Sequence, residues 1–196
     1  MLEVKDAKIA VGGKTLVENL SFAARDGRLT CITGEAGSGK TTLLRTLMGF
    51  LPVEEGFVSV DGELLTIYSS HAFRSLMVYL PQEIQLLGHE LMPPAMKRVV
   101  AEEFGVWNSL LPSADPESQA EPLSAEQIFQ LEKQTILQAE GKQIIIADEP
   151  AAHLTEELTH QVLNLLKAQA AQGKTVLIAS RNPLLISHAD EVLNLK

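Results

Sequence analysis

The sequence predicts an α/β fold with a largely parallel central sheet, an N-terminal antiparallel β flap and a short helical insertion. Short apolar runs rich in β-branched residues alternate with segments of helical periodicity along most of the chain. Several of these runs lack polar alternation, which is typical of parallel strands that are covered on both faces. A cluster of prolines within residues 88–122 interrupts the alternation and marks the insertion.

The expected elements follow in a definite order. An alternating pattern around a Gly12-Gly13 turn predicts antiparallel strands within the first 25 residues. Further strands are expected at residues 29–33, 57–60, 76–80, 143–148 and 175–179. Helices are expected at residues 40–50 and 156–172, the second with Thr155 as its N-cap and Gly173 at its end.

Composition indicates one globular domain. The chain has 196 residues, of which 45% are hydrophobic and 21% charged, enough for a packed core. A net charge of −9 and an aromatic content of 5% disfavour a general nucleic-acid surface, so no nucleic acid is expected as a partner. The sequence offers no bilayer-spanning segment and no sign of an export signal, which favours a cytoplasmic location. The single cysteine, Cys31, is expected to be a buried core residue.

A glycine-rich loop follows the strand at residues 29–33 and opens the next helix. It fits the pattern G-x-x-x-x-G-K-[ST] and comprises Gly34, Glu35, Ala36, Gly37, Ser38, Gly39, Lys40, Thr41 and Thr42. Its backbone N–H groups and the helix N-terminus would cradle phosphates, with Lys40 on the β- and γ-phosphates and the Thr41 hydroxyl on Mg²⁺. A glycine turn that only caps a helix is the weaker interpretation, because Lys40 and Thr41 occupy the lysine and Ser/Thr positions of the pattern. The loop predicts a P-loop protein that binds a nucleoside triphosphate.

Two adjacent carboxylates end the apolar run at residues 143–148. Asp148 is expected to hold the Mg²⁺ shell, and Glu149 to polarise or position an attacking water. The other interpretation, a solvated acidic turn after a buried strand, is less favoured because the phosphate loop supplies the partner half of such a site.

Four motifs, in this order, resemble those of the ATP-binding cassette (ABC) ATPases. They are the phosphate loop (Walker A), Gln82 in a Tyr-Leu-Pro-Gln run, the signature-like loop at residues 123–127 (Leu-Ser-Ala-Glu-Gln), and the Walker B strand at residues 145–150. The resemblance covers essentially the whole chain. It implies the P-loop NTPase fold and a single nucleotide-binding domain over residues 1–196, with a helical subdomain at roughly 83–140 that includes the signature-like loop.

The same resemblance implies an ATPase subunit that uses ATP and Mg²⁺ to power a separate membrane permease from the cytoplasmic face of the membrane. Two cassettes would sandwich ATP in a head-to-tail dimer, either a homodimer or a heterodimer with another ABC subunit, and Ser124 of each would reach the γ-phosphate in the other. Glu149, Gln82 and Arg181 would be the catalytic residues. Thr41, Gln82 and Asp148 would surround the metal.

The chain departs from the family pattern at four positions. Glu126 replaces a signature glycine and would repel a triphosphate unless it points to solvent. Arg181 stands where a switch histidine is expected and would bond the γ-phosphate without exchanging protons. Thr155 replaces an aspartate that couples the two sites, or simply caps the next helix. Val11 replaces the aromatic that stacks on adenine, which predicts loose base selectivity.

These departures leave alternatives to a transporter ATPase open. The chain could be a catalytically weak ATP-binding regulatory module, or the degenerate half of a heterodimeric cassette pair. A soluble ABC protein without a transport role is less favoured, because the chain is acidic and has no basic runs. Neither the transported substrate nor its direction is encoded in this chain. The histidines His71, His89, His153, His160 and His188 are expected at the surface.

Overall fold

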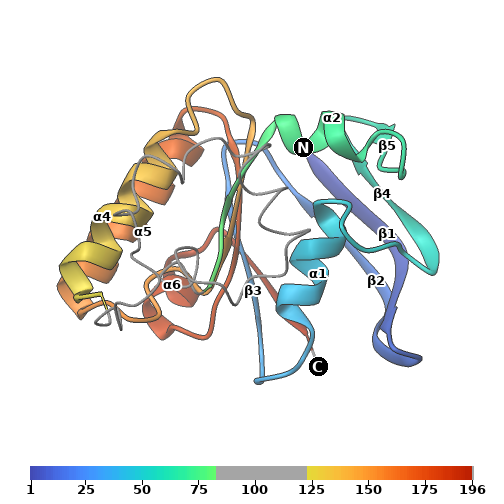
Figure 1. The fold of residues 1–196 in the computed structure, drawn as a ribbon, viewed down its shortest axis with the longest axis horizontal. Helices are drawn as coiled ribbons and strands as arrows, with labels where there is room; N and C mark the ends of the chain where they lie inside the picture. The colour runs from blue at the N-terminus through green and yellow to red at the C-terminus, as the bar shows by residue number, and fades with distance from the viewer. Residues whose placement is uncertain (83–122, 196) are drawn as a thin grey trace, which may run out of the picture.

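The computed structural model describes residues 1–82 and 123–195, which form two sheets with helices between and beside them (Figure 1). The first sheet has the strand order β2-β1-β4-β5 and the second the order β6-β7-β8-β3-β9. The strands are β1 (Leu2–Val11), β2 (Lys14–Ala24), β3 (Leu29–Gly34), β4 (Glu55–Val60), β5 (Glu63–Leu64), β6 (Met77–Leu80), β7 (Ile144–Asp148), β8 (Thr175–Ala179) and β9 (Glu191–Leu195). The helices are α1 (Lys40–Leu47), α2 (Ser70–Ser75), α4 (Ala125–Leu137), α5 (Glu156–Ala171) and α6 (Pro183–His188).

The first sheet is the predicted antiparallel flap. β1 pairs with β2 so that Val11 lies opposite Lys14, which leaves Gly12 and Gly13 as a two-residue turn. Both glycines have positive φ, +60° and +80°, as a tight hairpin with right-handed twist requires. β4 pairs antiparallel with the other side of β1, so the strand expected at residues 57–60 belongs to this flap.

All pairings in the second sheet are parallel, which confirms the predicted fold class. β7 and β8 are buried at every position because both faces of the sheet are covered. Alternate residues of each strand therefore belong to two different cores: Ile144 and Ile146 face one, Ile145 and Ala147 the other.

The helices divide between those two cores. α1 lies between the two sheets, where its leucines pack with residues of β1 and β4 (Figure 1). α4 and α5 lie side by side on the opposite face of the parallel sheet (Figure 1). α1 ends at Leu47, earlier than expected, and Gly49 follows with φ +74°. No helix within residues 1–82 and 123–195 is long and apolar enough to cross a membrane.

Local sequence signals account for the helix ends. Thr155 is the N-cap of α5, as predicted, and its Oγ1 accepts the Leu158 N–H at 3.3 Å. α4 begins with a capping box in which Ser124 Oγ accepts the Gln127 N–H and Gln127 Oε1 accepts the Ser124 N–H at 2.9 Å. The edge strand β9 was not predicted, because its exposed and half-buried positions alternate and it lacks a continuous apolar run.

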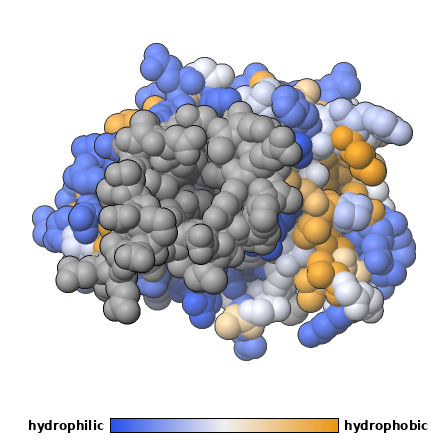
Figure 2. Space-filling view, viewed as in Figure 1, coloured by the Kyte–Doolittle hydropathy of each residue, from blue (hydrophilic) through white to orange (hydrophobic). Residues whose placement is uncertain are grey.

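Large apolar side chains are exposed near the end of the flap. Leu64, Ile67 and Tyr68, in β5 and the turn before α2, have exposed fractions of 54%, 86% and 98%. Figure 2 shows hydrophobic surface on the side of the molecule that carries the antiparallel sheet.

α4 buries one carboxylate, Glu132, which is only 5% exposed. Burial raises the pKa of Glu132 to about 7, and a hydrogen bond from the Ala151 N–H opposes that shift. Between the ordinary value of 4.5 and about 7, the native state holds a proton that the unfolded chain has lost. The free energy of unfolding should therefore fall as the pH rises through this range.

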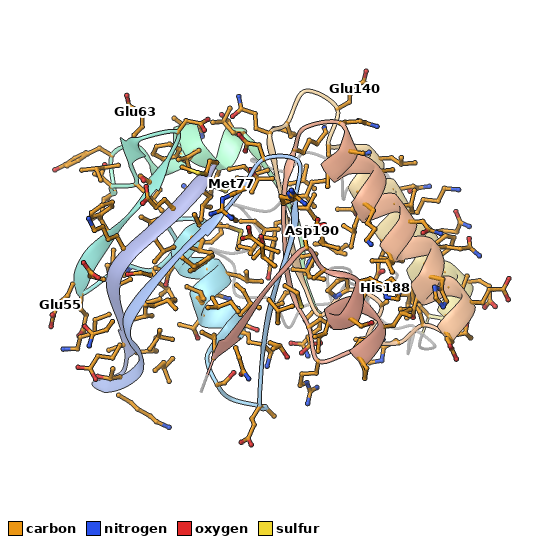
Figure 3. The ribbon with its side chains drawn as sticks, turned by 180° about the vertical axis from the view of Figure 1, so that it is seen from behind. Glu55, Glu63, Met77, Glu140, His188 and Asp190 are labelled. Carbon is orange, nitrogen blue, oxygen red and sulfur yellow. The ribbon has the colours of Figure 1, made fainter. Side chains whose placement is uncertain are left out.

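We expect Glu132→Gln to stabilise the protein more at pH 8 than at pH 5, by about 2 kcal/mol, because the amide carries no charge to bury. Urea unfolding at the two pH values measures this difference. Glu140→Gln is the matched control, since Glu140 is exposed and points away from the fold just beyond α4 (Figure 3). An equal effect of Glu132→Gln at both pH values would contradict the prediction.

Candidate nucleotide-binding site

A pocket of about 260 Å³ opens where β6, β7 and β8 end and α1 begins. It brings together ten of the predicted site residues and Leu16: Ala36, Gly37, Gly39, Lys40, Thr41, Thr42, Gln82, Asp148, Glu149 and Arg181. Gly34, Glu35 and Ser38 line a second hollow, which shares Ala36, Gly37 and Arg181 with the pocket. Ser124 is not among the residues that line either space.

Two glycines fix the path of the phosphate loop. A Cβ on Gly34 would lie 2.5 Å from the Leu195 carbonyl oxygen and 2.7 Å from Ser38 Oγ, closer than atoms can approach. Gly39 is the N-cap of α1 with φ +93°, and a Cβ there would lie 3.3 Å from Leu16. These positions let the loop wrap tightly around the N-terminus of α1, an arrangement that favours anions.

Lys40 is held inside the loop. Its side chain is 7% exposed, and Nζ donates hydrogen bonds to the carbonyl oxygens of Gly34 and Glu35, both at 2.9 Å. Ser38 Oγ is buried and has no hydrogen-bond partner among the described residues. The loop thus places a positive charge at the pocket and an unpaired hydroxyl at the adjoining hollow.

Asp148 and Thr41 form the part of the pocket that fits a hard cation. Asp148 is 1% exposed, and its Oδ1 has no hydrogen-bond partner in the described part of the chain. Burial raises the pKa of the Asp148 carboxyl, while a hydrogen bond with Thr41 and the charges of Arg45 and Lys40 oppose that shift. An unpaired buried carboxylate oxygen beside a hydroxyl suits Mg²⁺, which typically takes one or two protein oxygens together with phosphates and waters.

Glu149 is bound on both carboxylate oxygens by Arg181. The Arg181 backbone N–H donates to Oε2 at 3.1 Å, and Arg181 Nε–H donates to Oε1 at 3.2 Å. The Glu149 side chain is 10% exposed and that of Arg181 57%. From the sequence, Arg181 was expected to bond the γ-phosphate, and this ion pair with Glu149 was not predicted. The pair follows from the register of β7 and β8, which places Asp148 beside Ala179 and which no sequence signal displays.

The signature-like loop forms the N-terminal cap of α4 within this chain. The Ser124 hydroxyl caps the helix, so its expected contact with a nucleotide in a second cassette stays a prediction. Glu126 is exposed in the first turn of α4, where a carboxylate interacts favourably with the helix dipole. Its effect on a triphosphate in a second cassette stays a prediction.

Leu16 of β2 is the apolar residue that the sequence analysis missed. Val11 is 47% exposed and does not line the pocket, whereas Leu16 does, and a Cβ on Gly39 would lie 3.3 Å from the Leu16 side chain. A leucine offers a base contact surface without aromatic stacking, so the expectation of loose base selectivity stays a prediction.

The remaining sequence predictions concern residues outside the pocket. Cys31 is buried, and burial raises its pKa to about 12, as expected of an unreactive core thiol. His71, His153, His160 and His188 are exposed, the last at the end of α6 (Figure 3), and His89 lies outside the described residues. Most of the helical subdomain expected at residues 83–140 lies outside the described residues.

The fold and the pocket together define a P-loop protein that binds a nucleoside triphosphate. A protein-family model described as "ABC transporter" matches residues 17–152. The chain therefore belongs to the ABC transporter family, and the predicted class, an ATP-binding cassette of the ATPase type, is confirmed.

Individual relatives agree with that assignment. The ABC transporter ATP-binding/permease protein Rv1747 of Mycobacterium tuberculosis is 30% identical over 93% of the chain, which spans only 22% of that protein's length. A nucleotide-free ATP-binding cassette from an ABC transporter superposes with a TM-score of 0.72, at 22% identity, over 99% of this chain and 87% of that one. The dimeric bacterial ABC transporter cassette MJ0796 superposes with a TM-score of 0.70, at 20% identity, over 100% of this chain and 94% of that one. The two structural likenesses confirm the fold.

We expect Gly34→Ala to weaken nucleotide binding by at least about tenfold, because the added methyl group forces the loop away from the Leu195 carbonyl. Titration with a fluorescent ATP analogue measures the affinity. Gly12→Ala is the control, since that glycine also has positive φ but an added Cβ there would meet no atom of residues 1–82 and 123–195 within 4 Å. Affinity within twofold of wild type for Gly34→Ala would show that the close approach is not essential.

Proposed function

We propose that this chain binds and hydrolyses Mg²⁺-ATP and powers a separate membrane permease, as a peripheral subunit on the cytoplasmic face of the membrane. The observation that carries the proposal is the meeting of Lys40, Asp148, Glu149 and Arg181 in one pocket beside the phosphate loop. The family assignment supports the same activity.

Each residue has a distinct part in the proposed reaction. The loop amides and Lys40 bind the phosphates, while Thr41, Asp148 and Gln82 would hold Mg²⁺. The bound cation would supply positive charge that offsets the charge of the phosphates. Glu149 orients the attacking water and accepts its proton. Arg181 fixes the Glu149 carboxylate with Nε–H, one of five guanidinium donors, and we assign the terminal phosphate to the other four, which have no hydrogen-bond partner within residues 1–82 and 123–195.

The working unit we propose is a head-to-tail dimer, formed with a second copy or with another ABC subunit, in which Ser124 of each chain completes the other's site. A structural neighbour is described as a dimeric cassette, and a relative as an ATP-binding/permease protein, which supports both the dimer and the permease. We expect a multi-spanning membrane protein to co-purify with the full chain in mild detergent. Its consistent absence would remove the permease from the proposal.

We expect Arg181→Ala to lower ATP turnover by roughly 10- to 1,000-fold, because Glu149 loses its positioning partner and the phosphate loses a donor. Phosphate release measures turnover, and equilibrium titration measures ATP affinity, which should change less. Arg25→Ala, at an exposed arginine that pairs with Glu191 away from the pocket, is the control and should leave turnover unchanged.

The same ion pair favours a second candidate, a regulatory module that binds ATP and scarcely hydrolyses it. If Arg181 restrains Glu149 in an inactive state, Arg181→Ala should raise turnover instead of lowering it. A rise would favour this second candidate, and a fall the first.

A further inference from the structure

The segment from Glu149 to Thr155, here called the β7–α5 loop, has an unusual backbone at its start. Glu149 and Ala151 have φ of +47° and +65°, values that residues with side chains rarely adopt. Such a conformation persists only where surrounding contacts enforce it. Because Glu149 is the proposed base, whatever enforces this conformation also sets the direction of its side chain.

A buried carboxylate on α4 supplies that contact. The Ala151 N–H donates to Glu132 Oε1 at 3.0 Å and to Oε2 at 3.3 Å, across 19 residues of sequence. Ala151 is 3% exposed and Glu132 5%, so water does not substitute for either partner. Without Glu132, the Ala151 N–H would be a buried donor with no acceptor, which is costly.

The chemistry of Glu132 differs from that of its neighbours on α4. Ile128, Phe129 and Ile136 are also buried on this helix, and they form part of its apolar core. A carboxylate in such surroundings destabilises the fold unless it is paired, and no cation pairs with it in the described part of the chain. The contact that the structure describes for its carboxylate is the pair of hydrogen bonds from the Ala151 N–H. These bonds to the β7–α5 loop offset part of the free-energy cost of burying the carboxylate.

We propose that Glu132 is a positioning residue that fixes the β7–α5 loop through the Ala151 N–H and so aims Glu149 into the nucleotide pocket. This inference rests on the proposed role of Glu149 in hydrolysis. It also links α4, which begins next to Ser124, to the residue that would activate water.

The test compares three variants of the full chain. Glu132→Leu removes the acceptor at similar size, and Glu132→Gln keeps an oxygen that can accept the Ala151 N–H. Thr135→Val removes another buried polar group of α4, one that bonds to Leu131 within the helix and not to the loop. The measurements are kcat and KM for ATP, and hydrogen exchange of the Ala151 amide by NMR.

For Glu132→Leu we expect kcat to fall at least about tenfold with KM within about threefold, because the phosphate loop that binds ATP is intact. The Ala151 amide should exchange at least about tenfold faster. Glu132→Gln should keep kcat within about threefold of wild type, and Thr135→Val should leave kcat and amide exchange within about twofold.

Two results would overturn the proposal: wild-type kcat in Glu132→Leu, or a folded Glu132→Gln that is as impaired as Glu132→Leu. If Glu132→Leu does not fold, Glu132→Ala decides by the same measurements, since it also removes the acceptor and should speed Ala151 exchange at least about tenfold. Unchanged exchange in that variant would overturn the proposal. Amide exchange needs no turnover, so an inactive wild-type chain would contradict the proposed function while leaving the loop contact separately testable.

Discussion

The site depends on the common direction of β3, β6, β7 and β8 in the parallel sheet. Because parallel strands all end at one edge, the segments that follow them meet there although they are distant in sequence. Gly34, Gln82, Asp148 and Arg181 reach this edge from four different strands. The cores on the two faces hold each strand in register, and a slip of one residue would exchange its faces.

Charge balance is the second feature that shapes the pocket. Two cations, Lys40 and Arg181, lie among two carboxylates, Asp148 and Glu149. A triphosphate adds several negative charges to this set, which the loop amides and the proposed Mg²⁺ would offset. The two carboxylates differ in their surroundings: Asp148 has an unpaired buried oxygen, whereas both oxygens of Glu149 accept bonds from Arg181. Asp148 is therefore suited to hold a metal, and Glu149 is suited to orient a water.

Features governed by local rules could be predicted from the sequence. The phosphate loop, the buried strands β7 and β8, the Gly12-Gly13 turn and the Thr155 cap each follow from a few neighbouring residues. Contacts set by tertiary packing could not. Leu16 at the pocket wall, the Arg181–Glu149 pair and the Glu132–Ala151 bond each join elements whose alignment the sequence does not display.

Phosphate release from Mg²⁺-ATP by the full chain, with Glu149→Gln measured beside it, tests most directly whether this pocket hydrolyses ATP through Glu149. The account predicts turnover by the wild-type chain that Glu149→Gln reduces by roughly 100-fold or more, with ATP binding retained because the phosphate loop is unchanged. Equal turnover by the two proteins would contradict the role of Glu149, and ATP binding without turnover in the wild type, even beside its partners, would contradict the hydrolytic function.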